Sequence, residues 1–270
     1  KRGNHTIWEN LNLTAWAGQI IAVTGPNGAG KTTLFRAITG MLPVKEGSIL
    51  VNGEDSSRMT HKQRAQKLAI VNQTVEADFI SIEDYVLMGR LPYHAPLQLF
   101  ESKEDYAIAE ESMKLTGIWN KREKMMNRLS GGEQQLAAIA RALTQQTQIL
   151  LLDEPTTYLD LSHQFEIMEL TRQLKQAGKT VIMVLHDLGL ALSYADQLAV
   201  MQSGLLVFAG SPQKVLESGC LEQVFRVRIQ KGGLQKSGGY LFFPAIRRES
   251  GLCLCLTVRV RENKVPNGIR

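Results

Sequence analysis

Short apolar runs without polar alternation recur along the chain. Four of them are rich in branched residues, as is typical of strands buried on both faces. They span Ile20 to Thr24, Leu68 to Asn72, Ile149 to Leu152 and Thr180 to Leu185. Strands of this kind form parallel sheets covered by helices, so the pattern predicts an α/β fold.

Polar residues follow each of these four strands. The first strand continues into the loop from Gly25 to Thr32, and the second is followed by Gln73. The third ends in Asp153 and Glu154, and the fourth is followed by His186. Ligands of open parallel sheets bind beyond the carboxyl ends of the strands. We therefore predict that these polar residues converge on one pocket.

Between the second and third strands the pattern changes to helical periodicity. It predicts helices over Glu83 to Met88 and Lys103 to Leu115, and a further helix that opens at Ser130. Two other segments predict small antiparallel strand pairs. These are Ser48 to Val51, closing on Asn52 and Gly53, and Gln197 to Ala209, turning at Ser203 and Gly204.

The predicted organisation is one main domain with an insertion. With 270 residues and 44% hydrophobic content, the chain can bury one substantial core. The expected fold is a mostly parallel sheet flanked by helices, with a small antiparallel β subdomain and an inserted α-helical subdomain. The predicted domain covers 1–246, with its core in 1–77 and 146–246, its helical insertion in 78–145, and an unassigned basic tail in 247–270.

The composition of the chain indicates its cellular location and whether disulfides stabilise it. No apolar run approaches the roughly 18 to 20 residues of a membrane-spanning helix, and the N-terminus lacks a signal-peptide layout. The three cysteines, Cys220, Cys253 and Cys255, are an odd number without a CxxC pair, which argues against a disulfide framework. No nearby Cys or His turns Cys253 and Cys255 into a metal site. We expect a soluble chain in a reducing, cytoplasmic setting.

The net charge of +5 does not indicate a nucleic-acid partner. Six basic and two acidic residues lie in 247–270, so this tail carries +4 of the total. A nucleic-acid surface should instead place its basic residues on the folded body. We therefore predict no nucleic-acid partner.

The loop from Gly25 to Thr32 matches G-x-x-x-x-G-K-[ST] between a strand and a helical pattern that starts near Thr33. This is the context of a P-loop NTPase core, in which backbone N–H groups and a helix N-terminus hold phosphates. Lys31 would bind the β- and γ-phosphates, and the Thr32 hydroxyl would ligate Mg²⁺. A glycine-rich turn without a ligand is less favoured, because lysine followed by a hydroxyl at this spacing has no packing purpose. The predicted nucleotide-binding residues are Gly25, Pro26, Asn27, Gly28, Ala29, Gly30, Lys31, Thr32 and Thr33.

A second motif, Leu-Ser-Gly-Gly-Glu, occupies Leu129 to Glu133. Ser130 and Glu133 have the spacing of a helix capping box. That interpretation leaves Gly131 and Gly132 unexplained, because glycine is costly within a helix turn. The two glycines predict a close approach to the backbone, which an anion at this helix N-terminus would make.

An LSGGE motif just ahead of the acidic strand end at Asp153 and Glu154 resembles the ATP-binding cassette ATPases. The resemblance implies ATP and Mg²⁺ as cofactors. It implies that Asp153 holds Mg²⁺ and that Glu154 acts as general base on the attacking water. Gln73 would sense Mg²⁺ and this water, and His186 would contact the γ-phosphate. Taken alone, Gln73 would be expected in solvent and His186 in a structural hydrogen bond.

The same resemblance implies that two chains share each nucleotide. Ser130, Gly131, Gly132 and Glu133 would contact the γ-phosphate bound to the opposite subunit. Asp160 would lie near that second phosphate site, at the dimer interface. The resemblance also implies an adenine-stacking aromatic residue near the position of Lys1 or Arg2, which are not aromatic. We expect weaker ATP binding for that reason.

Three stretches resemble the ATPase subunits of bacterial importers for iron siderophores, haem and cobalamin: Val86 to Tyr93, Glu154 to Gln164 and His186 to Asp196. Such a subunit would form a homodimer beneath integral membrane permease subunits, at the cytoplasmic face of the inner membrane. A substrate-binding protein would be an indirect partner. An importer for another nutrient, such as zinc or manganese, is the alternative, and a soluble cassette ATPase outside transport is a less favoured one. The intact set of Lys31, Asp153, Glu154 and His186 argues against a module that senses ATP without hydrolysis.

Overall fold

The computed structural model describes residues 8, 11–75, 79–95, 98, 100–231 and 240–244. The chain divides into two compact units, Lys1–Phe225 and Arg226–Arg270. Lys1, Arg2, Cys253, Cys255 and the predicted basic tail lie outside the described residues. Within the described part of the chain, no helix is long and apolar enough to cross a membrane.

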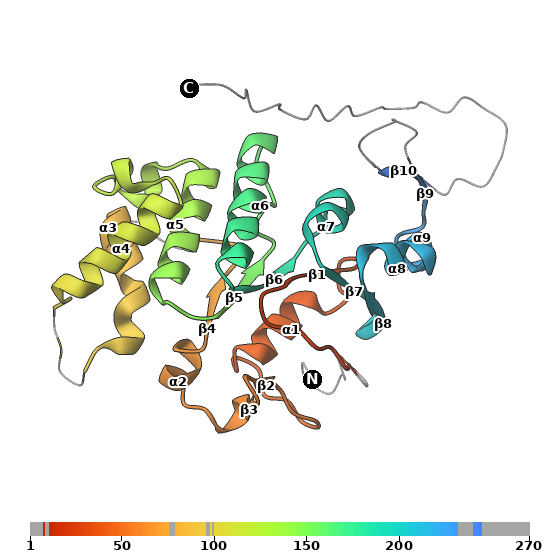
Figure 1. The fold of residues 1–270 in the computed structure, drawn as a ribbon, viewed down its shortest axis with the longest axis horizontal. Helices are drawn as coiled ribbons and strands as arrows, with labels where there is room; N and C mark the ends of the chain where they lie inside the picture. The colour runs from red at the N-terminus through yellow and green to blue at the C-terminus, as the bar shows by residue number, and fades with distance from the viewer. Residues whose placement is uncertain are drawn as a thin grey trace, which may run out of the picture. The chain divides into compact units, whose positions relative to one another are not determined.

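A six-stranded sheet forms the centre of the first unit, in the order β4-β5-β6-β1-β7-β8 (Figure 1). All neighbours pair in parallel except β7 and β8, which form an antiparallel hairpin. The four predicted buried strands are confirmed as the four adjacent strands β4, β5, β6 and β1. The strands are β1 Ile20–Thr24, β4 Leu68–Val71, β5 Ile149–Asp153, β6 Thr180–Val184, β7 Gln197–Gln202 and β8 Leu205–Gly210.

Helices cover both faces of this sheet, with α1 on one face and α6 and α7 on the other (Figure 1). Phe35 of α1 is fully buried in a core cluster with Ile21 of β1 and Leu151 of β5. Helix α1 begins at Lys31, two residues before the predicted start, because left-handed Gly30 (φ 97°) forms its N-cap. The helices are α1 Lys31–Ile38, α6 Leu161–Gln176, α7 Leu188–Tyr194, α8 Pro212–Glu217 and α9 Cys220–Phe225.

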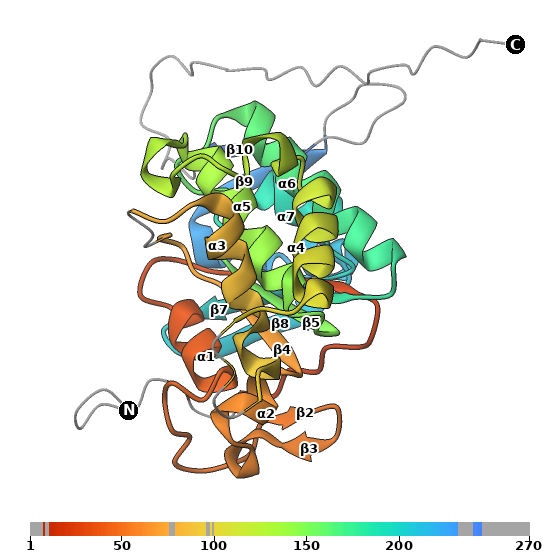
Figure 2. The same cartoon turned by 90° about the vertical axis from the view of Figure 1, so that its left-hand side faces the viewer.

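The segment between β4 and β5 is helical, as predicted. Figures 1 and 2 show α3, α4 and α5 side by side, and α5 also contacts β4 at the edge of the sheet. Its elements are α3 Ile82–Leu87, η2 Met88–Tyr93, α4 Lys103–Leu115, η3 Trp119–Lys121, η4 Met126–Arg128 and α5 Gly131–Thr144. We call α3 to α5, with the segments between them, the helical insertion.

Smaller elements complete the two units. Between α1 and β4 lie the antiparallel pair β2 Leu50–Val51 and β3 Glu54–Asp55, then η1 Ser56–Arg58 and α2 His61–Ala65. The strand predicted from Ser48 therefore begins two residues later. In the second unit, β9 Val227–Lys231 and β10 Tyr240–Pro244 pair in antiparallel fashion.

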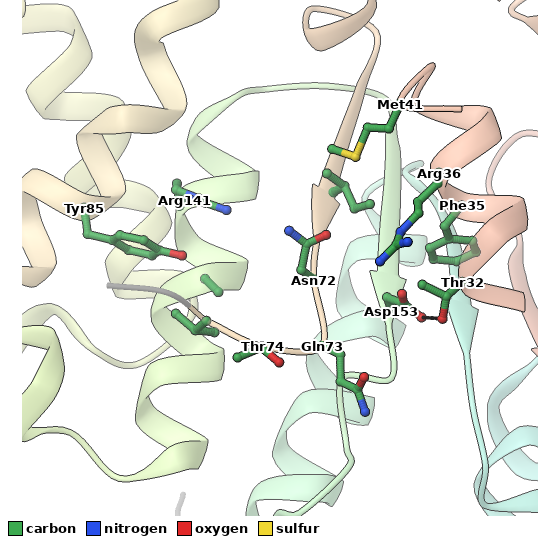
Figure 3. A pocket seen from close by; sticks show the side chains of 13 residues that line it. Thr32, Phe35, Arg36, Met41, Asn72, Gln73, Thr74, Tyr85, Arg141 and Asp153 are labelled. Carbon is green, nitrogen blue, oxygen red and sulfur yellow. Dashed lines mark hydrogen bonds between the residues drawn. The ribbon is translucent and has the colours of Figure 1, made fainter. Parts of the chain in front are cut away.

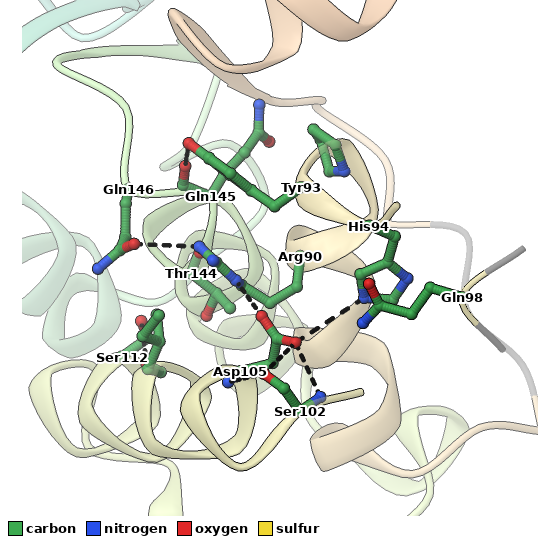
Figure 4. Close-up of polar contacts among 12 residues, drawn as sticks. Arg90, Tyr93, His94, Gln98, Ser102, Asp105, Ser112, Thr144, Gln145 and Gln146 are labelled. Atoms are coloured by element: carbon green, nitrogen blue, oxygen red, sulfur yellow. Dashed lines mark hydrogen bonds and ion pairs between the residues drawn. The ribbon is translucent and has the colours of Figure 1, made fainter. Parts of the chain in front are cut away.

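A buried ion pair holds the helical insertion together (Figure 4). The Arg90 Nε donates to Asp105 Oδ1 at 2.7 Å, and the two side chains are only 8% and 7% exposed. Arg90 Nη1 also donates to the Thr144 carbonyl and to Gln146 Oε1, each at 3.1 Å. Burial alone would raise the pKa of Asp105, but its bonds from Arg90 and Ser102 lower that pKa to about 2. Arg90 thereby joins η2 to α4 and to the end of α5.

Neighbouring hydrogen bonds tie this part of the insertion to the sheet. The Tyr93 hydroxyl donates to the Gln145 carbonyl at 2.7 Å. The Gln145 side-chain amide in turn donates to the carbonyls of Ala65, at the end of α2, and Leu68, at the start of β4. Gln66 Nε2 donates to the Pro92 carbonyl at 2.8 Å. The insertion is therefore fixed to the same strand that leads to Gln73.

Replacing Arg90 by methionine should destabilise the fold, because it leaves the Asp105 carboxylate buried without its partner. We expect a loss of about 3–5 kcal/mol in the free energy of unfolding by urea at neutral pH. A matched control is Arg172→Met, since the Arg172 and Glu169 side chains are 56% and 44% exposed. There the expected loss is about 0–1 kcal/mol. Equal losses in the two variants would contradict this role of the buried pair.

The same ion pair predicts a direction for the acid dependence of stability. The pKa of Asp105 in the folded chain is about 2, below its ordinary value of 3.8. The stabilisation from this group is therefore fully present above its ordinary pKa, and it is lost as the pH falls through about 2. Thermal unfolding between pH 6 and pH 2 should show the advantage over Arg90→Met shrinking across this acid range.

Candidate functional site

The polar residues after the four strands do converge. The Gln73 side chain, after β4, donates through Nε2 to Glu154 Oε2 at 2.7 Å. His186, after β6, has its Nε2 2.5 Å from Glu154 Oε1. The Thr32 hydroxyl donates to Asp153 Oδ1 at 3.4 Å, which joins the loop after β1 to the end of β5. The convergence predicted from the strand ends is therefore confirmed.

The loop before α1 has the backbone that its glycines were expected to allow. Gly28 and Gly30 have φ values of 80° and 97°, in the left-handed region that favours glycine. A Cβ on Gly25 would lie 2.1 Å from the Met201 carbonyl oxygen, so packing against β7 requires glycine there. A Cβ on Gly28 would meet nothing within 4 Å, which leaves that side of the loop open to a ligand.

Lys31 lies within this loop. Its side chain is buried, and Nζ donates to the Gly25 and Pro26 carbonyls at 2.7 Å and 3.1 Å. Burial lowers the pKa of Lys31, while the nearby Glu154 and Asp153 carboxylates act in the opposite direction. Two carbonyls of the loop thus hold the ammonium. A phosphate oxygen can replace either carbonyl as its acceptor.

Asp153 and Glu154 point to different partners, as adjacent residues at a strand end should. Asp153 is buried beside Thr32, and burial raises the pKa of its carboxyl above the ordinary value. Glu154 leaves the strand with a φ of 53°, a conformation that costs energy in a residue other than glycine. This backbone turn directs its carboxylate to Gln73 and His186.

The Thr32 and Asp153 oxygens suit Mg²⁺, a hard cation that is usually held by one or two carboxylates, a hydroxyl and phosphates. A cation at this place would also offset the cost of burying the Asp153 carboxylate, which its raised pKa reflects. The residues present therefore fit the metal that the sequence predicts.

The start of α5 shows the predicted capping box. The Ser130 hydroxyl accepts from the Glu133 N–H at 3.3 Å, and Glu133 Oε2 accepts from the Ser130 N–H at 2.8 Å. Lys121 Nζ lies 2.5 Å from the other Glu133 oxygen. Its hydrogen bond, together with that of Ser130, lowers the pKa of Glu133 to about 2.

The two glycines of this motif differ in their surroundings. A Cβ on Gly132 would lie 2.3 Å from His163 Cδ2, whereas one on Gly131 would meet only Leu159, at an ordinary 3.6 Å. The close approach predicted for both glycines is thus made at Gly132 by an imidazole of the same chain. His163 accounts for glycine at position 132 within one chain, whereas no crowding by the described residues accounts for glycine at position 131.

Asp160 precedes α6 and caps it, since its Oδ1 accepts from the His163 N–H at 2.9 Å. Two residues earlier, Tyr158 has a φ of 64° and is 95% exposed. Within the described ranges, no hydrogen bond or ion pair joins Asp160 or the start of α5 to the phosphate loop. These residues therefore do not complete the site of their own chain through direct polar contacts.

Two residues at the site were missed by the sequence analysis. The Trp8 indole Nε1 donates to the Gly30 carbonyl at 3.3 Å. The Thr157 hydroxyl donates to Glu154 Oε2 at 3.3 Å. Its position three residues after Glu154 was a usable signal for Thr157, whereas nothing local in the sequence connects Trp8 to Gly30.

A cavity of about 460 Å³ opens beside Asp153 and extends to the helical insertion (Figure 3). Thr32 and Arg36 of α1 line one side, and Tyr85 and Arg141 of the insertion line the other. Gln73 and its neighbours Asn72 and Thr74 lie between the two sides. The loop after β4 is therefore shared by the site and by the insertion.

Comparison with known proteins assigns this arrangement to a family. Residues 8–157 match the ABC transporter family, and the chain belongs to it. It is an ATP-binding cassette that hydrolyses ATP.

Individual proteins agree with this assignment. The chain is 38% identical to the achromobactin transport ATP-binding protein CbrD of Dickeya dadantii, over 83% of this chain and 84% of that protein. It is 36% identical to the ferric enterobactin transport ATP-binding protein FepC of Escherichia coli, over 84% of each. Among solved structures, an ABC transporter assigned to the metal-chelate type, in an inward-facing conformation, aligns with a TM-score of 0.77 and 28% identity. That alignment covers 88% of this chain and 90% of the other.

Replacing Glu154 by glutamine should nearly stop ATP turnover, because the amide cannot accept a proton from water. Loss of general-base assistance predicts a fall of about 10² to 10⁴ in kcat. Binding of a fluorescent ATP analogue should stay close to that of the parent chain, since Lys31 and the loop are unchanged. Hydrolysis at the parental rate would show that Glu154 is not the base.

Replacing Trp8 by phenylalanine keeps an aromatic ring but removes the hydrogen bond to Gly30. We expect the KM for ATP to rise by about two- to tenfold, the equivalent of one ordinary hydrogen bond, with little change in kcat. Trp16→Phe is the matched control, because Trp16 is 66% exposed. An unchanged KM in the Trp8 variant would limit this residue to packing.

Proposed function

We propose that this chain is the ATP-hydrolysing subunit of a bacterial importer for an iron siderophore, haem or cobalamin. The observation that carries the hydrolytic part is the meeting of Gln73, His186 and Thr157 on the Glu154 carboxylate. The transport class is supported by relatives that serve achromobactin and ferric enterobactin, and by the structural match of the metal-chelate type.

The chemistry follows from how these side chains are held. The P-loop backbone and Lys31 would bind the phosphates, and Thr32, Asp153 and Gln73 would hold Mg²⁺, which would supply charge neutralisation for phosphoryl transfer. Each Glu154 oxygen already has a side-chain partner, so the plane of the carboxylate is fixed. Its remaining lone pairs accept the proton of the attacking water. His186 lies beside this carboxylate and is assigned to the γ-phosphate.

A homodimer completes each site in this proposal. Helix α5 begins with backbone N–H groups that attract phosphate, and Asp160 lies on an exposed turn. Among the residues that the structure describes, neither has a polar partner in the phosphate loop of the same chain. Ser130, Gly131, Gly132, Glu133 and Asp160 are therefore assigned to the nucleotide of the second subunit, so that ATP joins two chains.

Membrane association would come through permease subunits. The cavity between Arg36 and Tyr85 lies beside the Gln73 loop, where a cytoplasmic helix of a permease can dock and sense the state of the site. The chain would then lie at the cytoplasmic face of the inner membrane, and a substrate-binding protein would act through the permease. An importer for zinc, manganese or another nutrient is the second candidate, because related cassettes share parts of the same motifs.

Reconstitution tests the transport class. The chain, with the permease encoded beside its gene, should be assembled in liposomes and supplied with candidate chelates on their binding protein. Uptake of a ferric chelate, haem or cobalamin that stops with Glu154→Gln is expected. Uptake of free zinc or manganese ions, or a soluble ATPase with no adjacent permease gene, would favour an alternative.

The need for two chains has its own test. The specific ATPase activity of the isolated chain should rise with protein concentration, because each site requires residues of a second copy. Mixing the parent with an excess of Lys31→Ala chains should change the activity per parental site. Activity per chain that is constant over a hundredfold dilution would contradict a shared site.

A further inference from the structure

The imidazole of His163, in the first turn of α6, packs against the first turn of α5. A Cβ added to Gly132 would lie 2.3 Å, 2.4 Å and 2.8 Å from His163 Cδ2, Cγ and Nε2. Because Cγ is close to the root of the side chain, the whole ring blocks this position. The ring would have to rotate away to admit even a methyl group.

Asp160 holds this ring in place. Its Oδ1 lies 2.8 Å from His163 Nδ1 and also accepts from the His163 N–H at 2.9 Å. Moving the ring would break the first contact and disturb the N-cap of α6. Asp160 therefore holds the His163 ring against Gly132.

The turn before α6 is also held by hydrogen bonds from the first turn of α6. Gln164 Nε2 donates to the carbonyls of Leu159 at 2.9 Å and Thr156 at 3.3 Å. Tyr158, inside this turn, has the left-handed φ of 64°. Such a conformation persists only when the surroundings hold it. Residues 156–160 thus form a braced loop attached to the first turn of α6.

We propose that His163 is a positioning residue that locks the braced loop 156–160 to the LSGGE turn at the start of α5. The two elements that the proposed function turns toward the nucleotide of the second subunit then move as one body. This inference rests on that proposed function. It adds a distinct reason for glycine at position 132, namely room for the ring.

The alternative is that Gly132 is glycine only because a phosphate of the second subunit approaches it. The two explanations differ in one respect. A clash with His163 disappears when the ring is removed, whereas a clash with an arriving phosphate does not.

A double-variant cycle in the full chain therefore tests the proposal, using Gly132→Ala, His163→Ala and both together. Gly132→Ala alone should lower kcat by about tenfold or more, as expected when a fixed ring is displaced. In the His163→Ala background, the same glycine substitution should change kcat by less than about twofold, because the two positions are coupled. Equal losses in both backgrounds would overturn the proposal.

Further readouts separate positioning from loss of folding and from failure of the proposed dimer. Binding of a fluorescent ATP analogue and the melting temperature without nucleotide should stay near parental values in His163→Ala, while kcat falls. If KM and melting temperature change but kcat does not, His163 is only a packing residue. Dimerisation is measured separately, by size-exclusion chromatography of Glu154→Gln with ATP. A monomer there would refute the shared site whatever the outcome of the cycle.

Discussion

Parallel pairing of β4, β5, β6 and β1 is the constraint on which the site depends. Each of these strands comes from a separate part of the chain, and only their parallel register places four carboxyl ends at one edge. Asp153 pairs with Val184, so Glu154 and His186 leave neighbouring strands close together. A slip of one residue would turn every side chain to the opposite face of the sheet. The apolar strands therefore fix the catalytic geometry as well as the core.

The sequence predicts those parts of the molecule that local pattern determines. The four strands, α4 and the capping box of Ser130 and Glu133 follow from periodicity and spacing, and so does the convergence of Gln73 and His186. Helix α1 begins earlier than predicted because Gly30 adopts a left-handed conformation and becomes the cap. That conformation could be read only from the folded loop.

Contacts between distant segments account for what the sequence did not predict. Trp8 is bonded to Gly30, and His163 packs against Gly132, yet neither pair has a spacing rule. At Gly132 the sequence correctly indicated a crowded backbone but did not indicate that His163 is a group lying close to it. A glycine shows that something lies close without showing which group it is. The roles proposed for Asp160 and Gly131 toward a second chain are of the same kind, since they depend on how two copies of the chain pack together.

The ion pair between Lys121 and Glu133 limits which substitutions these two positions can accept. The capping carboxylate stands at the point where α5 offers its N–H groups, and Lys121 of η3 cancels its charge. Losing Lys121 would leave an uncompensated anion beside the turn, while replacing Glu133 by the neutral glutamine would leave a surplus cation. The two positions are thus expected to covary among relatives. With a neutral residue at position 133, lysine would no longer be required at position 121.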